Sequence, residues 1–596
     1  MIEATKSTVD PITVDVLMHR LDAVTAHMAD TLVRTCYSPI FYDMNDFSTA
    51  LFDREGRLIA QSIGCPVHLA AMPASVASAL EEFGEQDLHP GDTILLNDPY
   101  RGGSHLPDLT FVTPVHFDGE LVGFAGTRAH VVDIGGTAPG SMYAQAVEIV
   151  QEGLRIPPVK IYAGGQPARD AWEIVIANTR LPHWLAGDVR AAVAANDMGR
   201  RYFIELFEKY GKQVLLGSVD AMLAYAERRM RAAIAAIPDG TYQAEDFIDC
   251  DGVDPDPIRV RVRITVDGDR MEVDWTGSNP PVKGPVNRPR HAAIGDTMFA
   301  LKSVLDPEGP ANAGWFRPVE VVIPDQCFLN AQWPSPVFNG NLETAGRITD
   351  VIWQALGQAL PDRIEGMTYG GCNAVLFGGT DPRTGIPYVV ADVPPGGWGA
   401  RATKDGLHTT FHLLGNCRDM PIEVAELLHP LRVERTEYRP DSGGGGRHRG
   451  GLGLLREYRF LDHNVMFGVE SSRSIDGPPG VFGGEAGAPM RLVLCSPDGD
   501  EEVVAGMTDA GEWKMCIANV NVPANWSVRM ESAGGGGYGD PLERDVTLVE
   551  RDVRGGLVSL EQARALYGVV LDPETLDVHS DETAAQRAAL LAGRAA

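Results

Sequence analysis

One stretch of this chain constrains its structure more than any other, because it predicts a long β-hairpin. Residues 109–117 and 120–131 are rich in Val, Thr, Phe and other strand-forming residues. Asp118-Gly119 between them is typical of a two-residue turn that joins antiparallel strands. We therefore expect the two strands to run antiparallel, so that the beginning and the end of this segment lie close together.

The open end of this hairpin gathers three side chains of the same chemical kind. If the residues that flank the turn pair with each other, counting back along both strands sets Pro107 opposite His130. His105, Asp108 and His130 are then expected to converge there, with a slip of one residue in the register left open. Neutral imidazoles and a carboxylate are ligands that Zn²⁺ and Mn²⁺ accept. The alternative is that two histidines and an aspartate merely share a surface loop.

Length and charge restrict the classes of protein to consider. At 596 residues the chain is too long for one hydrophobic core, and three or four domains are expected. Its formal net charge of −30 argues against nucleic acid or an anionic membrane as partner. No apolar run approaches the roughly 20 residues of a membrane span, and the N-terminal segment does not read as a signal peptide. A cytoplasmic location is the expectation.

The order of patterns predicts an α+β protein of several domains. Residues 1–240 are expected to form a mixed α/β region that carries the metal ligands. Residues 241–425 are expected to form a central α+β region that follows a largely helical stretch. Residues 426–596, with short strands and many glycines, are predicted to form a β-rich region that ends in a helical tail.

Local patterns predict individual elements within these regions. Apolar residues at helical spacing predict helices over 12–35, 72–83, 187–237 and 341–360. Residues 46–53 and 58–61 are expected to form a hairpin with a turn at 54–57, and residues 93–96 a strand. The helical stretch 187–237 is expected to be broken near Gly211 and Gly217. His68 lies on a piece that resembles a strand, where it is a candidate general base or a structural histidine.

Other motifs are less specific. Gly443–Gly446 and Gly534–Gly537 could present backbone N–H groups to an anion, but tight surface loops are favoured because no phosphate-binding motif with its Lys-Ser/Thr occurs. The basic residues 447–449 could bind an anionic group or pair with neighbouring acids. Asp133 could orient a metal ligand or be a turn residue. None of the eight cysteines forms a Cys-x-x-Cys pair, so reduced, mostly buried thiols are expected.

Several motifs, in order along nearly the whole chain, resemble the hydantoinase B/5-oxoprolinase family. The family includes N-methylhydantoinase and caprolactamase subunits and the large subunits of acetone and acetophenone carboxylases. The matching segments are Asp46-Phe-Ser-x-Ala-Leu-Phe-Asp53, Pro66-Val-His-Leu69, Asn97-Asp-Pro-Tyr100, Gly103-Ser-His105-Leu-Pro-Asp108, Glu152-Gly-Leu-Arg-Ile-Pro-Pro158, Gly340-Asn-x-Glu343, Asp441-Ser-Gly-Gly444, Arg449-Gly-Gly451 and Gly534-Gly-Gly-Gly-Tyr-Gly-Asp-Pro541.

The resemblance implies a set of metal ligands. Carried over residue by residue, one divalent ion, zinc or manganese, is held by Asp46, His105, Asp108 and His130. Asp43 lies close to Asp46 in sequence. The resemblance also leaves His68 as a candidate acid or base beside the ion.

The resemblance further implies a reaction and a partner. Relatives work with a hydantoinase A-like subunit that binds ATP and phosphorylates the substrate carbonyl oxygen, so ATP is expected on the partner and not on this chain. A heterotetramer of two plus two subunits is expected. The implied activity is hydrolysis of a hydantoin, 5-oxoproline or similar lactam, in which the metal activates water. The alternatives are a subunit of an ATP-dependent ketone carboxylase and a non-catalytic scaffolding subunit.

Overall fold

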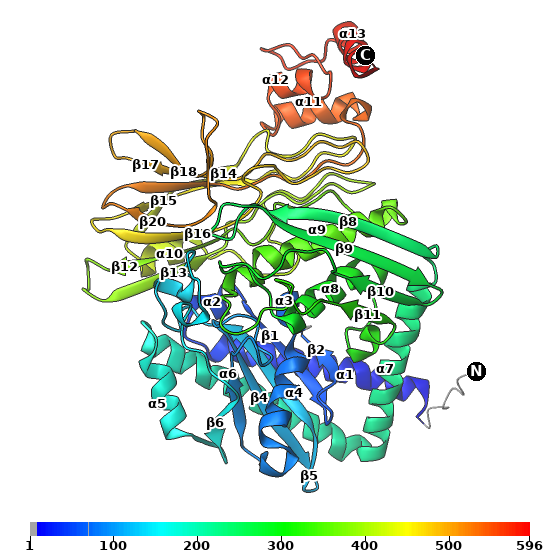
Figure 1. Cartoon of the computed structure of the whole chain (residues 1–596), viewed down its shortest axis with the longest axis vertical. Coiled ribbons are helices and arrows are strands. Elements are labelled where there is room, and N and C mark those ends of the chain that lie inside the picture. The colour runs from blue at the N-terminus through cyan, green and yellow to red at the C-terminus, as the bar shows by residue number, and fades with distance from the viewer. Residues whose placement is uncertain (1–8, 63, 70, 596) are drawn as a thin grey trace.

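The N-terminal part of the protein is built on an antiparallel sheet of seven strands (Figure 1). The computed structural model describes residues 9–62, 64–69 and 71–595. The strands of this sheet stand in the order β2-β1-β5-β4-β3-β6-β7. Their bounds are β1 Phe47–Asp53, β2 Leu58–Gln61, β3 Thr93–Leu96, β4 Asp108–Phe117, β5 Glu120–His130, β6 Val159–Ala163 and β7 Gln166–Pro167.

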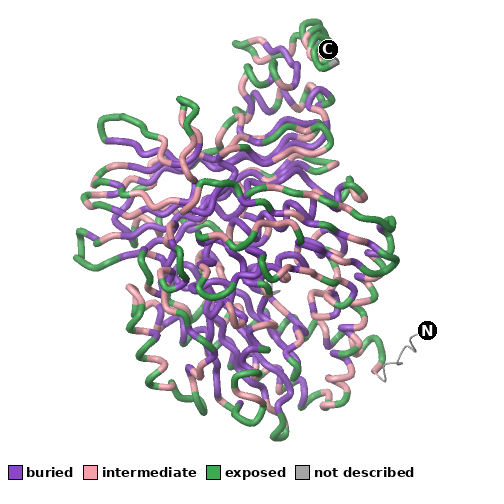
Figure 2. Tube along the Cα trace, viewed as in Figure 1, coloured by how far each residue is buried: buried purple, intermediate pink, exposed green. Residues whose placement is uncertain are grey.

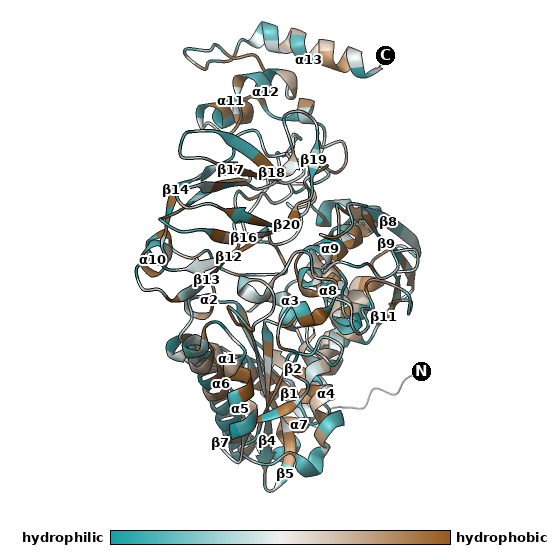
Figure 3. Ribbon diagram, turned by 60° about the vertical axis from the view of Figure 1, so that its left-hand side comes forward, coloured by the Kyte–Doolittle hydropathy of each residue, from teal (hydrophilic) through white to brown (hydrophobic). Residues whose placement is uncertain are grey.

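Helices cover both faces of this sheet, as Figure 3 shows from the side. Helices α1 (Pro11–Thr35) and α6 (Pro182–Tyr210) pack on one face and α4 (Met72–Phe83) packs on the other. Helix α1 begins where Asp10 accepts hydrogen bonds from the backbone of its first turn, with Pro11 at the first helical position. Its buried apolar residues recur at helical spacing, as predicted, and comprise Leu17, Leu21, Val24, Met28 and Leu32.

A pair of long helices leads out of this region. Helix α6 ends at Gly211, whose φ of +79° favours glycine, and α7 (Lys212–Ile234) begins directly after it. The predicted break near Gly211 is therefore confirmed. The predicted break near Gly217 is wrong, because that residue lies inside α7.

The central part of the chain pairs a smaller sheet with two helices. Its strand order is β11-β10-β9-β8, antiparallel except where β10 and β11 run parallel. Helices α8 (Arg290–Leu305) and α9 (Glu343–Gly357) are largely buried beside it (Figure 1). The strands are β8 Gly240–Ile248, β9 Ile258–Asp267, β10 Arg270–Asp274 and β11 Val319–Val322.

Two further sheets form the strand-rich remainder. One has the order β13-β12-β16-β20 and combines strands from both sides of residue 425. The division of the chain into the regions 1–240, 241–425 and 426–596 stays a prediction. The other sheet has the order β14-β15-β21-β17-β18-β19. Their strands are β12 Ala374–Thr380, β13 Pro387–Asp392, β14 Leu431–Tyr438, β15 Leu454–Phe460, β16 Val465–Glu470, β17 Arg491–Cys495, β18 Glu501–Met507, β19 Trp513–Lys514, β20 Ile517–Val522 and β21 Ser527–Glu531.

Short helices complete the fold and end the chain. The predicted helical tail consists of α11 (Val546–Arg554), α12 (Leu560–Ala565) and α13 (Ser580–Ala595) and projects at one end of the molecule in Figure 1. Ser559 caps α12 by accepting from Gln562 N. The remaining helices are α2 Pro39–Tyr42, α3 Pro66–Leu69, α5 Arg169–Ala177, α10 Ile422–Leu428, α11 Val546–Arg554, α12 Leu560–Ala565 and α13 Ser580–Ala595. Among the described residues, no helix is both long and apolar enough to cross a membrane.

The two glycine tracts lie inside the protein and pack on each other. Gly444 N donates to Gly535 O at 2.8 Å, and Gly537 N donates to Glu485 O at 2.9 Å. A Cβ added to Gly535 would lie 2.0 Å from the backbone oxygen of Trp398, so only glycine permits this approach. The interpretation of these tracts as tight surface loops is wrong, because most of these glycines are buried and the N–H groups of Gly444 and Gly534–Gly537 donate to backbone carbonyls of neighbouring segments (Figure 2).

Candidate metal centre

The hairpin of β4 and β5 positions two of the predicted ligands. Asp118 and Gly119 have φ values of +51° and +80°, the conformation of a tight turn that matches strand twist. A β-bulge between Val115 and His116 then shifts the register by one residue. Asp108 consequently pairs with His130. The predicted pairing of Pro107 with His130 is wrong by one residue, which is the slip in register that the sequence left open. Directly opposed residues point to the same face of a sheet, which brings these two side chains together.

His105 joins them from the turn that leads into β4. Its carbonyl accepts from Asp108 N at 3.1 Å, and its Nδ1 lies 2.9 Å from Asp108 Oδ2. The rings of His105 and His130 are 5.0 Å apart between centroids. One ligand atom from each of His105, Asp108 and His130 lies within 4.8 Å of the other two. The convergence of these three side chains at the open end of the hairpin is therefore present in the fold.

The chemistry of these atoms fits a divalent cation. His105 Nε2 and His130 Nδ1 are buried and have no hydrogen-bond partner. His105 Nδ1 and Asp108 Oδ1 are also buried, and they contact Asp108 Oδ2 at 2.9 Å and His68 Nε2 at 3.2 Å within the same group. Buried polar atoms without partners are costly, so two unpartnered imidazole nitrogens beside a buried carboxylate require an explanation. Lone pairs of imidazole nitrogen and carboxylate oxygen are the donors that zinc and manganese take, and the three residues would hold such an ion.

The pKa of the Asp108 carboxyl group agrees with a role as a metal ligand. Burial acts to raise the pKa of Asp108, but the adjacent His105 and His68 outweigh burial and hold it well below its usual range. Burial also lowers the pKa of His130. A negative carboxylate beside a neutral imidazole is the form in which both side chains donate to a metal.

Asp46 lies at the edge of this group. It directly precedes β1, which pairs with β5, and its carbonyl accepts from His130 N at 3.1 Å. Its Oδ1 lies 3.3 Å from Cys65 Sγ and 3.8 Å from His68 Nε2. The compact set formed by the other three ligands does not include Asp46. Its proposed place in the ligand set therefore rests on the resemblance together with this proximity.

His68 reaches the same point from a helix and not from a strand. The strand-like interpretation of its segment is wrong, because Pro66–Leu69 forms the short helix α3. Its Nε2 lies 3.2 Å from Asp108 Oδ1, and its Nδ1 lies 3.5 Å from Ser48 Oγ. The ring is fully buried and lines the same cavity as Asp46 and His130.

Residues that the sequence did not single out hold the loop before β4. Arg128 is fully buried and donates to Thr110 Oγ1, Ser75 Oγ and the Gly102 carbonyl. Ser104 Oγ donates to Asp108 Oδ2, which fixes the carboxylate. No short motif marks Arg128, because its partners come from three separate segments of the chain. Ser104 directly precedes His105 in the sequence, and this position beside a potential metal ligand could have identified it.

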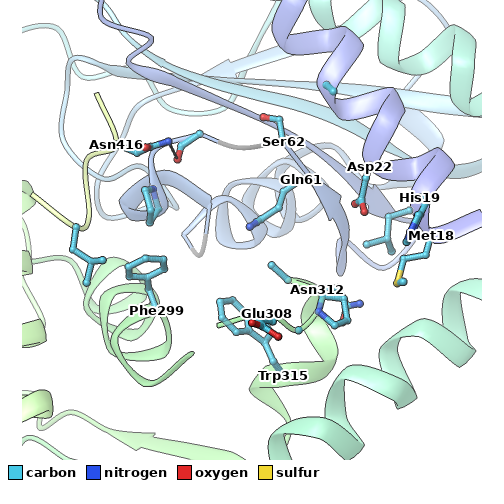
Figure 4. Close-up of a pocket in the computed structure, with 18 of the residues that line it drawn as sticks. Met18, His19, Asp22, Gln61, Ser62, Phe299, Glu308, Asn312, Trp315 and Asn416 are labelled. Carbon is cyan, nitrogen blue, oxygen red and sulfur yellow. Dashed lines mark hydrogen bonds between the residues drawn. The ribbon is translucent and has the colours of Figure 1, made fainter. Parts of the chain in front are cut away.

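Two neighbouring spaces lie at and beside the centre. A cavity of about 50 Å³ is lined by Asp46, His68 and His130. A cleft of about 1210 Å³ opens beside it between α1 and the segment 308–315 (Figure 4). Phe411 and Cys417 line both spaces and therefore separate them. In Figure 4 the labelled residues of the cleft wall are Met18, His19, Asp22, Gln61, Ser62, Phe299, Glu308, Asn312, Trp315 and Asn416.

The remaining candidates have structural roles. Asp133 accepts from Gly135 N, Gly140 N and Arg180 N, so it organises a loop. Its Oδ2 also pairs with Arg180 NH1 at 2.8 Å, which favours the turn interpretation over the orientation of a metal ligand. In the basic cluster, Arg449 pairs with Asp552 at 3.2 Å, in line with pairing to neighbouring acids.

Comparison with known proteins agrees with this architecture. The family model described as Hydantoinase B/oxoprolinase matches residues 10–541. Caprolactamase subunit beta of Pseudomonas jessenii is 33% identical over 95% of this chain and 97% of its own length. The crystal structure of the ATP-dependent caprolactamase from that organism superposes with a TM-score of 0.91 at 31% identity, and covers 98% of this chain and 100% of the matched chain.

Two further comparisons extend the picture. A 5-oxoprolinase of Dictyostelium discoideum is 31% identical over 89% of this chain, which spans 40% of that longer protein. A nucleotide-free acetone carboxylase shares the fold with a TM-score of 0.90 at 21% identity, over 98% of this chain and 83% of the matched one. On the match over residues 10–541 and these similarities along nearly its whole length, the chain belongs to the hydantoinase B/oxoprolinase family.

Proposed function

We propose that this chain is the hydrolytic, metal-dependent subunit of an ATP-dependent cyclic amide hydrolase. The observation that carries the proposal is the buried, convergent group of His105, Asp108 and His130, in which His105 Nε2 and His130 Nδ1 lack hydrogen-bond partners. Relatives named for cyclic amide substrates support the reaction class. The substrate is a hydantoin, 5-oxoproline or a similar lactam.

The chemistry of such a substrate explains why two activities are needed. A lactam carbonyl is a poor electrophile, because amide resonance stabilises it. Phosphorylation of its oxygen by a partner turns that oxygen into a leaving group. A divalent ion held by His105, Asp108 and His130, with Asp46, supplies Lewis-acid chemistry that activates water at neutral pH.

The protein's own groups perform the remaining tasks. Ser104 and the neighbouring histidines keep Asp108 in its negative form and fixed orientation. His68, which faces the carboxylates of Asp46 and Asp108, is the proposed acid or base that moves a proton at Nε2. The small buried cavity excludes bulk water from the reacting carbon, and the large cleft admits the substrate.

The proposed partner is a hydantoinase A-like subunit that binds ATP. The similar caprolactamase chain is named as a beta subunit, and the caprolactamase of known structure is described as ATP-dependent. The 5-oxoprolinase carries the region similar to this chain within a longer polypeptide, of which this chain spans 40%. Both facts support an assembly with a second functional part, and we propose a heterotetramer of two plus two.

The test is turnover by the co-purified complex on a panel of lactams, hydantoins and ketones, with and without bicarbonate. The proposal predicts ATP-dependent ring opening of at least one cyclic amide without any need for bicarbonate. Bicarbonate-dependent consumption of a ketone would replace it with the carboxylase alternative. A complex inert toward the whole panel, with no bound ion, would favour the scaffolding role.

A further inference from the structure

A second cluster of metal-binding atoms lies beside the histidine centre. Cys65 Sγ is 3.6 Å from Cys417 Sγ and 3.3 Å from Asp46 Oδ1. One ligand atom from each of the three residues lies within 4.8 Å of the other two. These atoms come from segments 352 residues apart, so no spacing in the sequence indicated them.

The distances within this cluster suit a shared ion better than a disulfide. A disulfide requires an S–S separation of about 2.05 Å. Two thiolates that each bind a tetrahedral ion at about 2.3 Å lie roughly 3.8 Å apart. The observed separation of 3.6 Å is close to the second value and requires little movement.

Hydrogen bonds from the backbone and from one side chain hold the two cysteine segments together. Val67 N donates to Leu414 O at 3.1 Å, and Asn416 Nδ2 donates to Gly64 O at 3.3 Å. Cys65 N in turn donates to Phe47 O at 3.4 Å, which ties the cluster to β1. The two thiols are thus positioned by the same elements that position Asp46.

The position of the cluster allows an ion to enter. Cys65 is buried, whereas Cys417 is half-buried and lines both the large cleft and the small cavity. Three protein ligands leave one position of a tetrahedral ion free for water or another small ligand. Each thiol would lose its proton to solvent on binding, because the thiolate is the ligand.

We propose that Asp46, Cys65 and Cys417 form a second metal-ion site, for a thiophilic divalent ion such as Zn²⁺. Asp46 stands between this site and the histidine centre, so its carboxylate connects the two. The second site lies at the boundary between the cleft and the cavity. This proposal does not depend on the proposed hydrolysis, since the ligands and their distances are independent of any substrate.

The test is a titration of the metal-depleted full-length protein with Cd²⁺, whose bonds to thiolate absorb in the near ultraviolet. Wild-type protein is expected to develop this absorption and to bind one more ion than Cys65→Ser or Cys417→Ser, each of which should lose it. Cys372→Ser is the matched control, because Cys372 lines the same cavity but lies outside the cluster, and it should keep the signal. His105→Ala should also keep it, which separates the two sites.

A second measurement needs no variant. Zn²⁺ should slow the alkylation of Cys417 by iodoacetamide at least tenfold in wild-type protein, as followed by peptide mass analysis. The proposal is overturned if Cd²⁺ produces no thiolate absorption in wild-type protein, or if the absorption persists in Cys417→Ser. Alkylation of Cys417 at one rate with and without Zn²⁺ would overturn it as well.

Discussion

Asp108 lies directly opposite His130 in the register of β4 and β5, so two ligand-type side chains project from one end of a hairpin. This pairing depends on the bulge at Val115 and His116, since an unbroken register would place Pro107 there. The hairpin thus acts as a fixed frame, and the loop that contains His105 folds over its end.

Replacement of His105 by alanine should remove most of the activity. His105 contributes a buried Nε2 without a hydrogen-bond partner, and loss of a ligand should cost more than the roughly 10–100-fold typical of residues behind the ligands. Steady-state turnover with ATP and a lactam measures this. His116→Ala, at the far end of the same hairpin, is the control and should keep near-normal turnover. Similar rates for the two variants would remove His105 from the site.

Alanine substitutions at two glycines should have different effects, one on stability alone and the other on ion binding. A Cβ at Gly119 meets nothing within 4 Å, so Gly119→Ala should cost only about 1 kcal/mol for its φ of +80°. A Cβ at Gly103 would lie 2.1 Å from Asn97 O, so Gly103→Ala should displace the loop that carries His105. Urea unfolding and metal content measure the two effects. Loss of the ion in Gly119→Ala, or full retention in Gly103→Ala, would contradict the argument.

Removal of the buried Arg128 should destabilise the fold. Its guanidinium donates to Thr110, Ser75 and the Gly102 carbonyl, and Arg128→Met removes these three buried hydrogen bonds, of which Ser75 and Gly102 keep only the one between them. We expect a loss of about 3 kcal/mol in the free energy of unfolding. Arg54→Met is the control, because Arg54 forms an exposed pair with Glu85 and should change stability by less than about 1 kcal/mol. Equal effects in denaturant titrations would refute this role for Arg128.

Glu152 should make stability depend on pH. Burial raises its pKa to about 8 from an ordinary 4.5, so the folded protein keeps a proton that the unfolded chain releases. Because the folded state then binds more protons, stability should fall as pH rises from about 4.5 to about 8. Glu152→Gln, which keeps an acceptor for Val337 N and Phe338 N, should flatten this slope. Urea midpoints across that range measure it, and an unchanged slope would reject the assignment.

The sequence predicted features that depend on local chemistry. Asp118-Gly119 specifies a tight turn by itself, so the hairpin and the gathering of His105, Asp108 and His130 could be predicted. Family motifs added Asp46, whereas His68 was already a candidate general base from its own segment. The helix at Pro66–Leu69 was missed because four residues carry too little periodicity to separate a helical turn from a strand.

Features that depend on distant contacts could not be predicted. The register shift between Val115 and His116 arises where β4 pairs with β5, and the Cys65–Cys417 contact joins segments far apart in the chain. The buried glycine layer depends on backbone approaches such as Gly444 to Gly535, which leave no pattern beyond glycine itself. The sequence of a glycine tract does not distinguish an exposed loop from a buried, packed segment.

The most direct test of the account is anomalous X-ray scattering from crystals of the metal-loaded protein, recorded at the absorption edge of zinc or manganese. The account predicts a strong peak at coordination distance, about 2.0–2.2 Å, from nitrogens of His105 and His130 and an oxygen of Asp108. A metal-loaded crystal with no peak among these three side chains would contradict the central claim.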